Sequence, residues 1–219
     1  MIYDISLPLE SGGIVFPGDP EFKRHWEHRL EKGDRTNLSR LDFGAHTGTH
    51  IDAPLHMLPD GSDVTAYAND ALVGPARVIS ISDDKAVTVS ELRSKAIGGI
   101  KRLLIKTRNS TLWSQKAFSK DFVYLEPAAA QFLGELGVSL MGFDYLSIEK
   151  YGSAGFPAHL SLMYRKIVIL EGIDLSQVPE GDYILFCGAL RLPGGEGSPA
   201  RAMLADGASL KEWKLFNSK

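Results

Sequence analysis

The sequence His-Thr-Gly-Thr-His-Ile-Asp-Ala-Pro-Leu-His, at residues 46–56, is the most informative stretch of this chain. It holds three of the six histidines in the whole sequence, together with an aspartate. Imidazole nitrogens and carboxylate oxygens are the side-chain atoms that bind divalent metals such as zinc and manganese. A cluster this dense, with a glycine and a proline to shape the backbone, indicates a metal site rather than core packing.

The local backbone of this stretch is expected to be extended rather than helical. Pro54 disfavours helical geometry in the residue before it. We therefore expect the chain to leave a strand at 37–43, turn, and continue so that His50 and Asp52 project to the same side. With His46, these residues would supply three protein ligands and leave a position open to water, as in catalytic metal sites. A bound metal lowers the pKa of such a water from 15.7 to about 7.

His56 lies beyond the proline and admits two interpretations. It is a further metal ligand, or it is a free imidazole beside the metal. The second interpretation suits a general acid–base, because the ordinary imidazole pKa of about 6.5 lies near neutral pH.

Length and composition predict a single domain over residues 1–219. The chain is 44% hydrophobic, which is enough for one substantial core. The formal net charge of −3 argues against nucleic acid as a partner and against polybasic membrane binding. Cys187 is the single cysteine, so no intrachain disulfide is possible, and we expect cytoplasmic residence.

Hydrophobic patterning predicts a mixed α/β fold, because short strands dominate the first third of the chain and alternate with helices afterwards. The expected strands are rich in Ile, Val, Leu, Phe and Tyr and are bounded by turn residues. They cover residues 2–7, 22–28, 37–43, 77–81, 102–107, 138–143, 166–170 and 183–190.

Four helices are expected, and three of them have a start or stop signal. Thr88 or Ser90 caps a helix at 89–96, and Pro127 and Gly137 bound one at 128–136. A short helix fits 158–165. The last is expected at 199–204, with Ser198 as its N-cap and Pro199 at its first position.

The run His46-x-Gly-Thr-His50-x-Asp52-x-Pro54-x-His56 resembles the motif of the cyclase family of metal-dependent hydrolases, which includes bacterial kynurenine formamidases and isatin hydrolases. The resemblance extends over most of the chain. The segments that carry it are Ile-Ser-Leu-Pro-Leu at 5–9, Phe-Pro-Gly-Asp at 16–19, Gly-Phe-Asp-Tyr-Leu-Ser at 142–147, and Leu-Pro at 192–193 with Gly-Ser-Pro-Ala-Arg at 197–201.

The resemblance implies roles for residues that spacing alone does not single out. His159 and Glu171 match the two distal ligands that complete a two-metal site, although Glu171 is otherwise equally well read as a solvated strand end. His56 matches the catalytic histidine of the family. Phe16 stands where kynurenine formamidases carry a tryptophan that contacts substrate. It keeps an aromatic face for a flat substrate, or it is simply a core aromatic beside a turn.

The activity implied is hydrolysis of a C–N bond in a small amide, an arylformamide resembling N-formylkynurenine, or a lactam, by metal-activated water. One or two divalent ions are expected, zinc before manganese. The implied fold is a single-domain α/β arrangement of the swivelling β/β/α type, with a mixed, barrel-like sheet and packed helices, and the implied assembly is a homodimer. Two alternatives stay open: a metal-dependent cyclase or lyase acting on a carbonyl substrate, and a non-catalytic metal-binding protein on the same scaffold.

Overall fold

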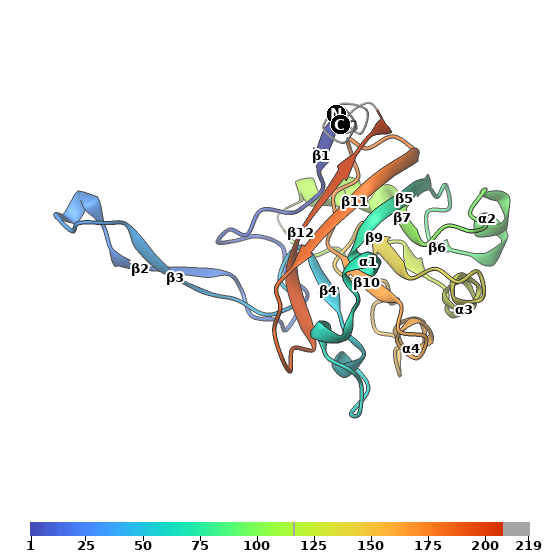
Figure 1. Cartoon of the computed structure of the whole chain (residues 1–219), viewed down its shortest axis with the longest axis horizontal. Coiled ribbons are helices and arrows are strands. Elements are labelled where there is room, and N and C mark those ends of the chain that lie inside the picture. Colours follow the sequence, from blue (N-terminus) through green and yellow to red (C-terminus); the bar gives the residue numbers. More distant parts are fainter. Residues whose placement is uncertain (116, 208–219) are drawn as a thin grey trace, which may run out of the picture.

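The computed structural model describes residues 1–115 and 117–207, and its centre is a closed mixed sheet (Figure 1). Strand β12 pairs with β11 along most of its length and with β4 at its beginning, and this second pairing closes the sheet into a barrel. Strands β5, β7, β9 and β10 run parallel, whereas β4, β11, β12 and β1 join by antiparallel pairings. Their bounds, in sheet order, are β1 Ile2–Asp4, β12 Gly197–Ala205, β11 Gly181–Ala189, β5 Val73–Ser80, β7 Arg102–Lys106, β9 Leu140–Phe143, β10 Val168–Glu171 and β4 His50–Asp52.

Side chains on successive strand positions pack into two separate hydrophobic layers, as the period of two in a strand requires. In β7, Leu103 and Ile105 pack in the layer under the helices, whereas Leu104 packs inside the barrel. In β10, Ile169 belongs to the helix-side layer and Val168 to the interior. Both faces of the central strands are therefore buried.

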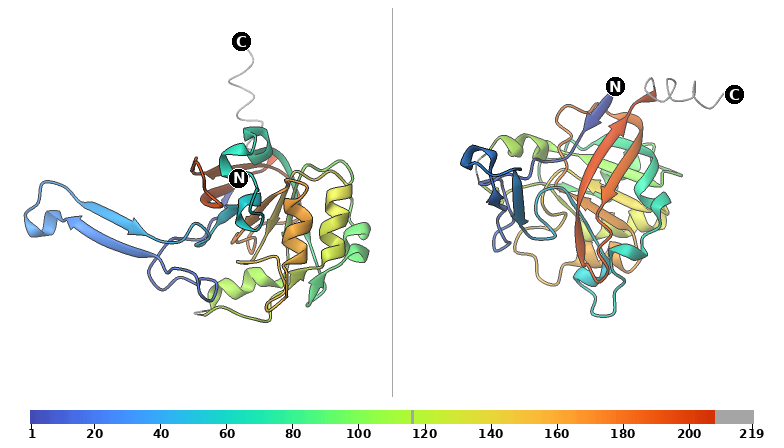
Figure 2. Two further views of the ribbon diagram at one scale, coloured as in Figure 1. Left: turned by 90° about the horizontal axis from the view of Figure 1, so that it is seen from below. Right: turned by 60° about the vertical axis from the view of Figure 1, so that its left-hand side comes forward.

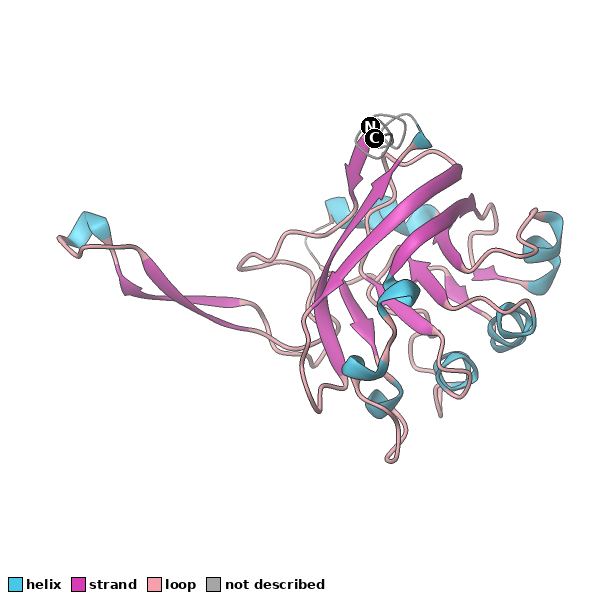
Figure 3. Cartoon of the chain, in the orientation of Figure 1, coloured by secondary structure: helices cyan, strands magenta, loops and turns pink. Residues whose placement is uncertain are grey.

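The helices lie outside the barrel, where they cover the parallel strands (Figure 3). The longer helices are α2 Val89–Ser94, α3 Pro127–Glu135 and α4 Pro157–Met163, with the single-turn α1 at Asn69–Leu72. A small parallel pair, β6 Ala86–Val87 and β8 Tyr124–Leu125, extends this side. Short 3₁₀ helices occupy Leu30–Lys32 (η1), Pro54–His56 (η2), Val64–Ala66 (η3) and Arg108–Ser114 (η4). In the described ranges, no helix is long and apolar enough to cross a membrane.

A hairpin of β2 (Lys23–His28) and β3 (Leu38–Asp42) projects far from the barrel, and we call residues 23–42 the arm (Figure 2). All six residues of β2 are exposed. The pairing of its two strands holds the hairpin together, and Figure 1 and the left view of Figure 2 show it extending away from the body.

The predicted α/β class, with a mixed barrel-like sheet and packed helices, is confirmed. Most expected elements are also present to within a few residues, including the helix that begins after Thr88, whose side chain accepts a hydrogen bond from the Glu91 amide. The prediction of a helix at 199–204 is wrong, since these residues form the middle of β12. Ser198 does not cap a helix. Its hydroxyl instead contacts the backbone amide and carbonyl of Leu190, the residue that follows β11. Strand partners on both sides override the local cap signal.

Candidate metal centre

The pairing of β4 with β10 sets three polar side chains on one face of the sheet. Ile51 lies opposite Leu170, and both pack inside the barrel. Because neighbouring residues of a strand point to opposite faces, His50, Asp52 and Glu171 point away from that interior. Glu171 is the residue directly opposite His50 in this ladder.

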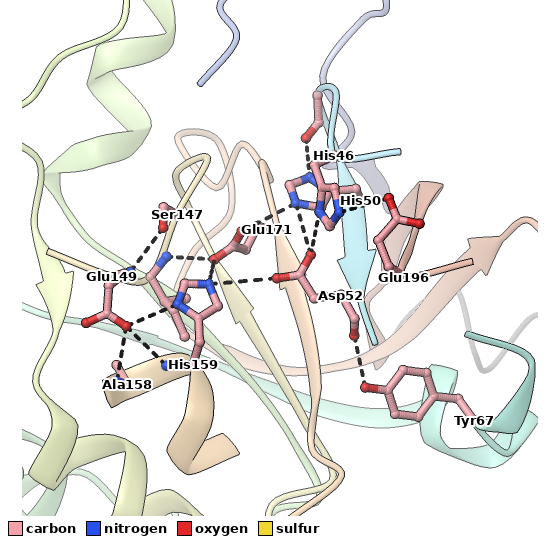
Figure 4. A network of polar contacts seen from close by, with 12 residues as sticks. His46, His50, Asp52, Tyr67, Ser147, Glu149, Ala158, His159, Glu171 and Glu196 are labelled. Atoms are coloured by element: carbon pink, nitrogen blue, oxygen red, sulfur yellow. Dashed lines mark hydrogen bonds and ion pairs between the residues drawn. The ribbon is translucent and has the colours of Figure 1, made fainter. Parts of the chain in front are cut away.

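Two further histidines reach the same place from other segments (Figure 4). His46, in the loop before β4, places its Nδ1 2.8 Å from Asp52 Oδ1. His159, in α4, places its Nε2 3.4 Å from Glu171 Oε1 and 3.8 Å from Asp52 Oδ2. The result is two groups of candidate ligands whose donor atoms lie within 4.8 Å of one another, His46–His50–Asp52 and Asp52–His159–Glu171, which share Asp52.

Two glycines permit the close approach of these segments. A Cβ at Gly197, in β12, would lie 2.6 Å from Cε1 of the His46 ring. Gly172 has a φ of 67°, and a Cβ there would collide with the backbone carbonyl of Gly48. That carbonyl lies 2.9 Å from His50 Nδ1, so it holds the His50 ring with Nε2 facing the carboxylates.

The centre gathers opposite charges in a buried space. Burial opposes ionisation of Asp52, but hydrogen bonds from His46 and His50 hold the pKa of this carboxyl well below its usual range. Burial also opposes charge on His50, yet its hydrogen bonds to Asp52 and Glu171 raise its pKa to about 10. His159 behaves in the same way, and its pKa is raised to about 10 against burial by the carboxylates around it.

This donor set fits a divalent metal ion. Asp52 and Glu171 are 1% and 3% exposed, and buried carboxylates of this kind require nearby positive charge. In the metal-free protein the protons on His50 and His159, whose pKa values are raised to about 10, supply that charge. A divalent cation held by imidazole nitrogen and carboxylate oxygen would replace those protons, as metal binding at such ligands generally does.

The candidate ligands line one side of a cavity of about 290 Å³, which is at the lower end for small-molecule sites. Phe16 lies in its wall, half-buried, with its ring edge-on to Phe118 at 5.1 Å between centroids. Phe118 in turn packs against the helix-side core layer, so Phe16 lies between that layer and the cavity. The other lining residues are Asp19, His46, His50, Asp52, His56, Met57, Leu146, Ser147, Phe156, His159 and Glu171.

His56 ends the 3₁₀ helix η2 at the exposed edge of this cavity. Its ring lies 4.1 Å from that of His46 between centroids, at 33° between the planes. Both ligand groups form without it. Partial burial lowers the pKa of His56. The negative charge of Asp52 acts in the opposite direction, and the neighbouring imidazoles lower the pKa further. A pKa below the usual value favours the neutral imidazole, which is the form that can take up a proton.

The structure thus brings together all seven residues singled out in the sequence, and their roles as ligands, catalyst and substrate contact stay predictions. It also adds residues that the sequence does not indicate. Tyr67 donates a hydrogen bond to the backbone carbonyl of Asp52 at 2.9 Å. Glu196 approaches His46 Nε2 to 3.6 Å, and Glu149 contacts His159. For Glu149 a local feature of the helix gives an indirect indication. The helix at Pro157 begins without a capping side chain of its own, so its first amides need a hydrogen-bond acceptor from another segment.

Comparisons with known proteins show similarity over most of the chain. The chain is 36% identical to a kynurenine formamidase of Bacillus cereus over 92% of its own length and 95% of the relative's. A solved structure described as a potential metal-dependent hydrolase with cyclase activity superposes with a TM-score of 0.82 at 31% identity, over 93% of this chain and 96% of the other. Isatin hydrolase A of Ralstonia solanacearum shares the fold, with a TM-score of 0.80 at 23% identity, over 94% of this chain and 92% of the other. The family model named Cyclase matches residues 3–150, and the chain belongs to this family of metal-dependent hydrolases.

Proposed function

We propose that this protein is a metal-dependent hydrolase that cleaves the C–N bond of a small amide, in particular an arylformamide resembling N-formylkynurenine, or of a lactam. The observation that carries the proposal is the pair of ligand groups sharing Asp52 on the wall of a small cavity that also contains His56 and Phe16. The 36% identity to a kynurenine formamidase supports the arylformamide class.

We further propose that the centre holds two ions, zinc before manganese. His46, His50 and Asp52 would hold one, and Asp52, His159 and Glu171 the other, since each group can supply three donor atoms. Three imidazoles in the combined set favour zinc over harder metals that prefer oxygen ligands. When bound, such ions polarise a carbonyl group and make water acidic enough to act at neutral pH.

The remaining residues of the cavity have complementary roles in this proposal. As water adds to the carbonyl carbon and the C–N bond breaks, a proton must move from the water to the leaving nitrogen. His56 is the group suited to carry it, because it lies beside His46 yet outside both ligand groups. Phe16 offers a flat apolar surface in the cavity wall against which an aromatic ring packs.

We also propose a homodimer in which the arm is the contact between subunits. Four large apolar side chains of the arm are exposed, namely Trp26, Leu30, Leu38 and Leu41, at 42%, 57%, 51% and 49%. An exposed apolar surface of this kind on a projecting hairpin is typical of a protein–protein contact. We also propose that the protein resides in the cytoplasm. This is supported by the presence of a single cysteine, Cys187, which is buried.

One experiment tests the proposed activity directly. The purified protein is analysed for metal, stripped with a chelator, reloaded with zinc or manganese, and assayed on a panel of formanilides, lactams and cyclic imides. We expect hydrolysis that depends on the metal and products that gain the mass of one water. A product of unchanged mass would instead support a cyclase or lyase. Bound metal without turnover on any member of the panel would support a metal-binding protein and contradict the proposal.

A further inference from the structure

Glu149 is a buried acidic residue that makes three contacts at the start of α4, two of them with the candidate ligand His159. The residue is 5% exposed. Its Oε2 accepts hydrogen bonds from the backbone amides of Ala158, at 3.1 Å, and His159, at 3.2 Å. The same oxygen lies 3.2 Å from His159 Nδ1 (Figure 4). One carboxylate oxygen therefore holds both the backbone and the side chain of His159.

Helix α4 depends on this carboxylate at its start. The first amides of a helix have no partner within it and need an acceptor from elsewhere. The N-cap residue, Phe156, makes no capping hydrogen bond through its side chain, and Pro157 has no amide hydrogen. The next two amides belong to Ala158 and His159, and both donate to Glu149. The orientation of the first turn is thus fixed by a residue outside the helix.

The contact with Nδ1 also decides which nitrogen of His159 is available as a ligand. A carboxylate accepts a hydrogen bond and cannot donate one when ionised, so it holds the ring proton on Nδ1. Nε2, which lies 3.8 Å from Asp52 and 3.4 Å from Glu171, is then the nitrogen that is left to bind a metal ion.

The three imidazoles of the centre differ in this outer contact. His50 is held by a backbone carbonyl, that of Gly48, which no side-chain substitution removes. His46 Nε2 lies 3.6 Å from Glu196, whose side chain is 46% exposed. Glu149 is buried and lies closer to its histidine, at 3.2 Å, than Glu196 does to His46. Among the three outer contacts, its loss is therefore expected to have the largest effect.

We propose that Glu149 is a positioning residue, which fixes the tautomer and orientation of His159 and thereby the affinity for the ion in the Asp52–His159–Glu171 group. This inference rests on the proposed function, because it requires that the centre binds metal. Outer carboxylates of this kind typically change metal affinity by about 10–100-fold when they are lost.

The test compares the full-length variants Glu149→Ala and Glu149→Gln with the wild type, with zinc as the probe. Metal affinity is measured by competition with a chromophoric chelator. We expect Glu149→Ala to lose about 10–100-fold in affinity for one ion and to keep the other. Glu149→Gln should recover most of this loss, because its amide oxygen can accept the same three hydrogen bonds.

Thr88→Ala is the matched control for a loss that is merely structural. The Thr88 hydroxyl accepts a hydrogen bond from the Glu91 amide at 3.2 Å and caps α2, away from the centre. This variant should melt at a lower temperature and bind zinc as the wild type does. A loss of zinc in Thr88→Ala equal to that in Glu149→Ala would overturn the inference, since general destabilisation would then explain both.

A spectroscopic measurement on the wild type keeps the inference testable even when Glu149→Ala does not fold. Nitrogen-15 NMR of the zinc-loaded protein, with the His159 signals assigned through His159→Gln, reports which ring nitrogen carries the proton. We expect the proton on Nδ1, and a proton on Nε2 would overturn the inference. Wild-type zinc affinity in a folded Glu149→Ala would also overturn it and leave the proposed function intact. Failure of the proposed function differs, because the wild type itself would then bind no zinc or, with zinc bound, would hydrolyse no member of the substrate panel.

Discussion

The metal centre and the arm are the two extremes of burial in this chain. At the centre, His50 and Asp52 are each 1% exposed, and their contacts reach residues more than a hundred positions away, such as Glu171. In the arm, every residue of β2 is exposed, and its strand partners all lie within the same twenty-residue hairpin, residues 23–42. The first region is held by long-range contacts among charged groups, and the second by a local backbone ladder.

This difference predicts whether a single substitution changes the stability and binding of its own subunit or leaves them nearly unchanged. A buried charged group leaves its partners unpaired when it is removed, which is costly for both binding and stability. An exposed side chain can be replaced with little effect on its own subunit, typically within about 0.5 kcal/mol. We therefore expect substitutions of the exposed apolar side chains of the arm to affect the proposed contact between subunits, and substitutions at the centre to affect the subunit itself.

The most severe expected effect comes from Asp52→Ala, because Asp52 belongs to both ligand groups. We expect the variant to retain no metal after gel filtration and to show no hydrolysis. Plasma mass spectrometry measures the metal, and circular dichroism confirms that the protein is folded. The control is Asp182→Asn, since Asp182 is 67% exposed and pairs with Arg77 far from the centre. Full metal content in Asp52→Ala would refute the assignment of this centre.

The next largest effect is expected for His56→Ala. His56 lies in the cavity wall but in neither ligand group, so the variant should keep its metal. Turnover should fall by about 10²–10⁴, the range for loss of an acid–base group. Steady-state kinetics with a formanilide measure it, and His28→Ala, at an exposed arm position, is the control. Unchanged turnover would show that His56 takes no part in catalysis.

A smaller effect is expected where packing alone is changed, in Gly197→Ala. The added methyl would lie 2.6 Å from the His46 ring and displace it. We expect metal affinity of the His46–His50–Asp52 group to fall on the order of 10-fold, as for other changes that reorient a ligand. Gly188→Ala is the matched control on the neighbouring strand, because its nearest atom, the Arg201 carbonyl oxygen, is 3.7 Å away. Equal zinc affinity in the two variants would show that the ring tolerates the methyl group.

The smallest effect on the subunit itself is expected in the arm. Trp26 and Leu41 lie on one face of the hairpin, because Trp26 pairs with Ser39 and Arg24 pairs with Leu41. The double variant Trp26→Ser with Leu41→Ser should keep its metal content but change from dimer to monomer in multi-angle light scattering. His25→Ser, on the other face, should stay dimeric. A dimeric double variant would remove the arm from the proposed interface.

The local part of the centre could be predicted from the sequence because it depends on short-range geometry. His50 and Asp52 are two residues apart, and the period of a strand places them on one side wherever the strand lies. The same reasoning found most strands and the cap at Thr88. It failed at Pro199, where a cap signal suggested a helix, because β12 is held as a strand by β11 and by β4.

The sequence by itself determined the ligand chemistry, the α/β class and the local placement of His46, His50 and Asp52. Tertiary structure alone decided that Glu171 stands opposite His50 and that Glu149 holds His159. The physical reason is that strand register and helix docking are set by burial of apolar side chains elsewhere, such as Ile51 against Leu170 in the barrel interior. No local spacing in the chain encodes those contacts.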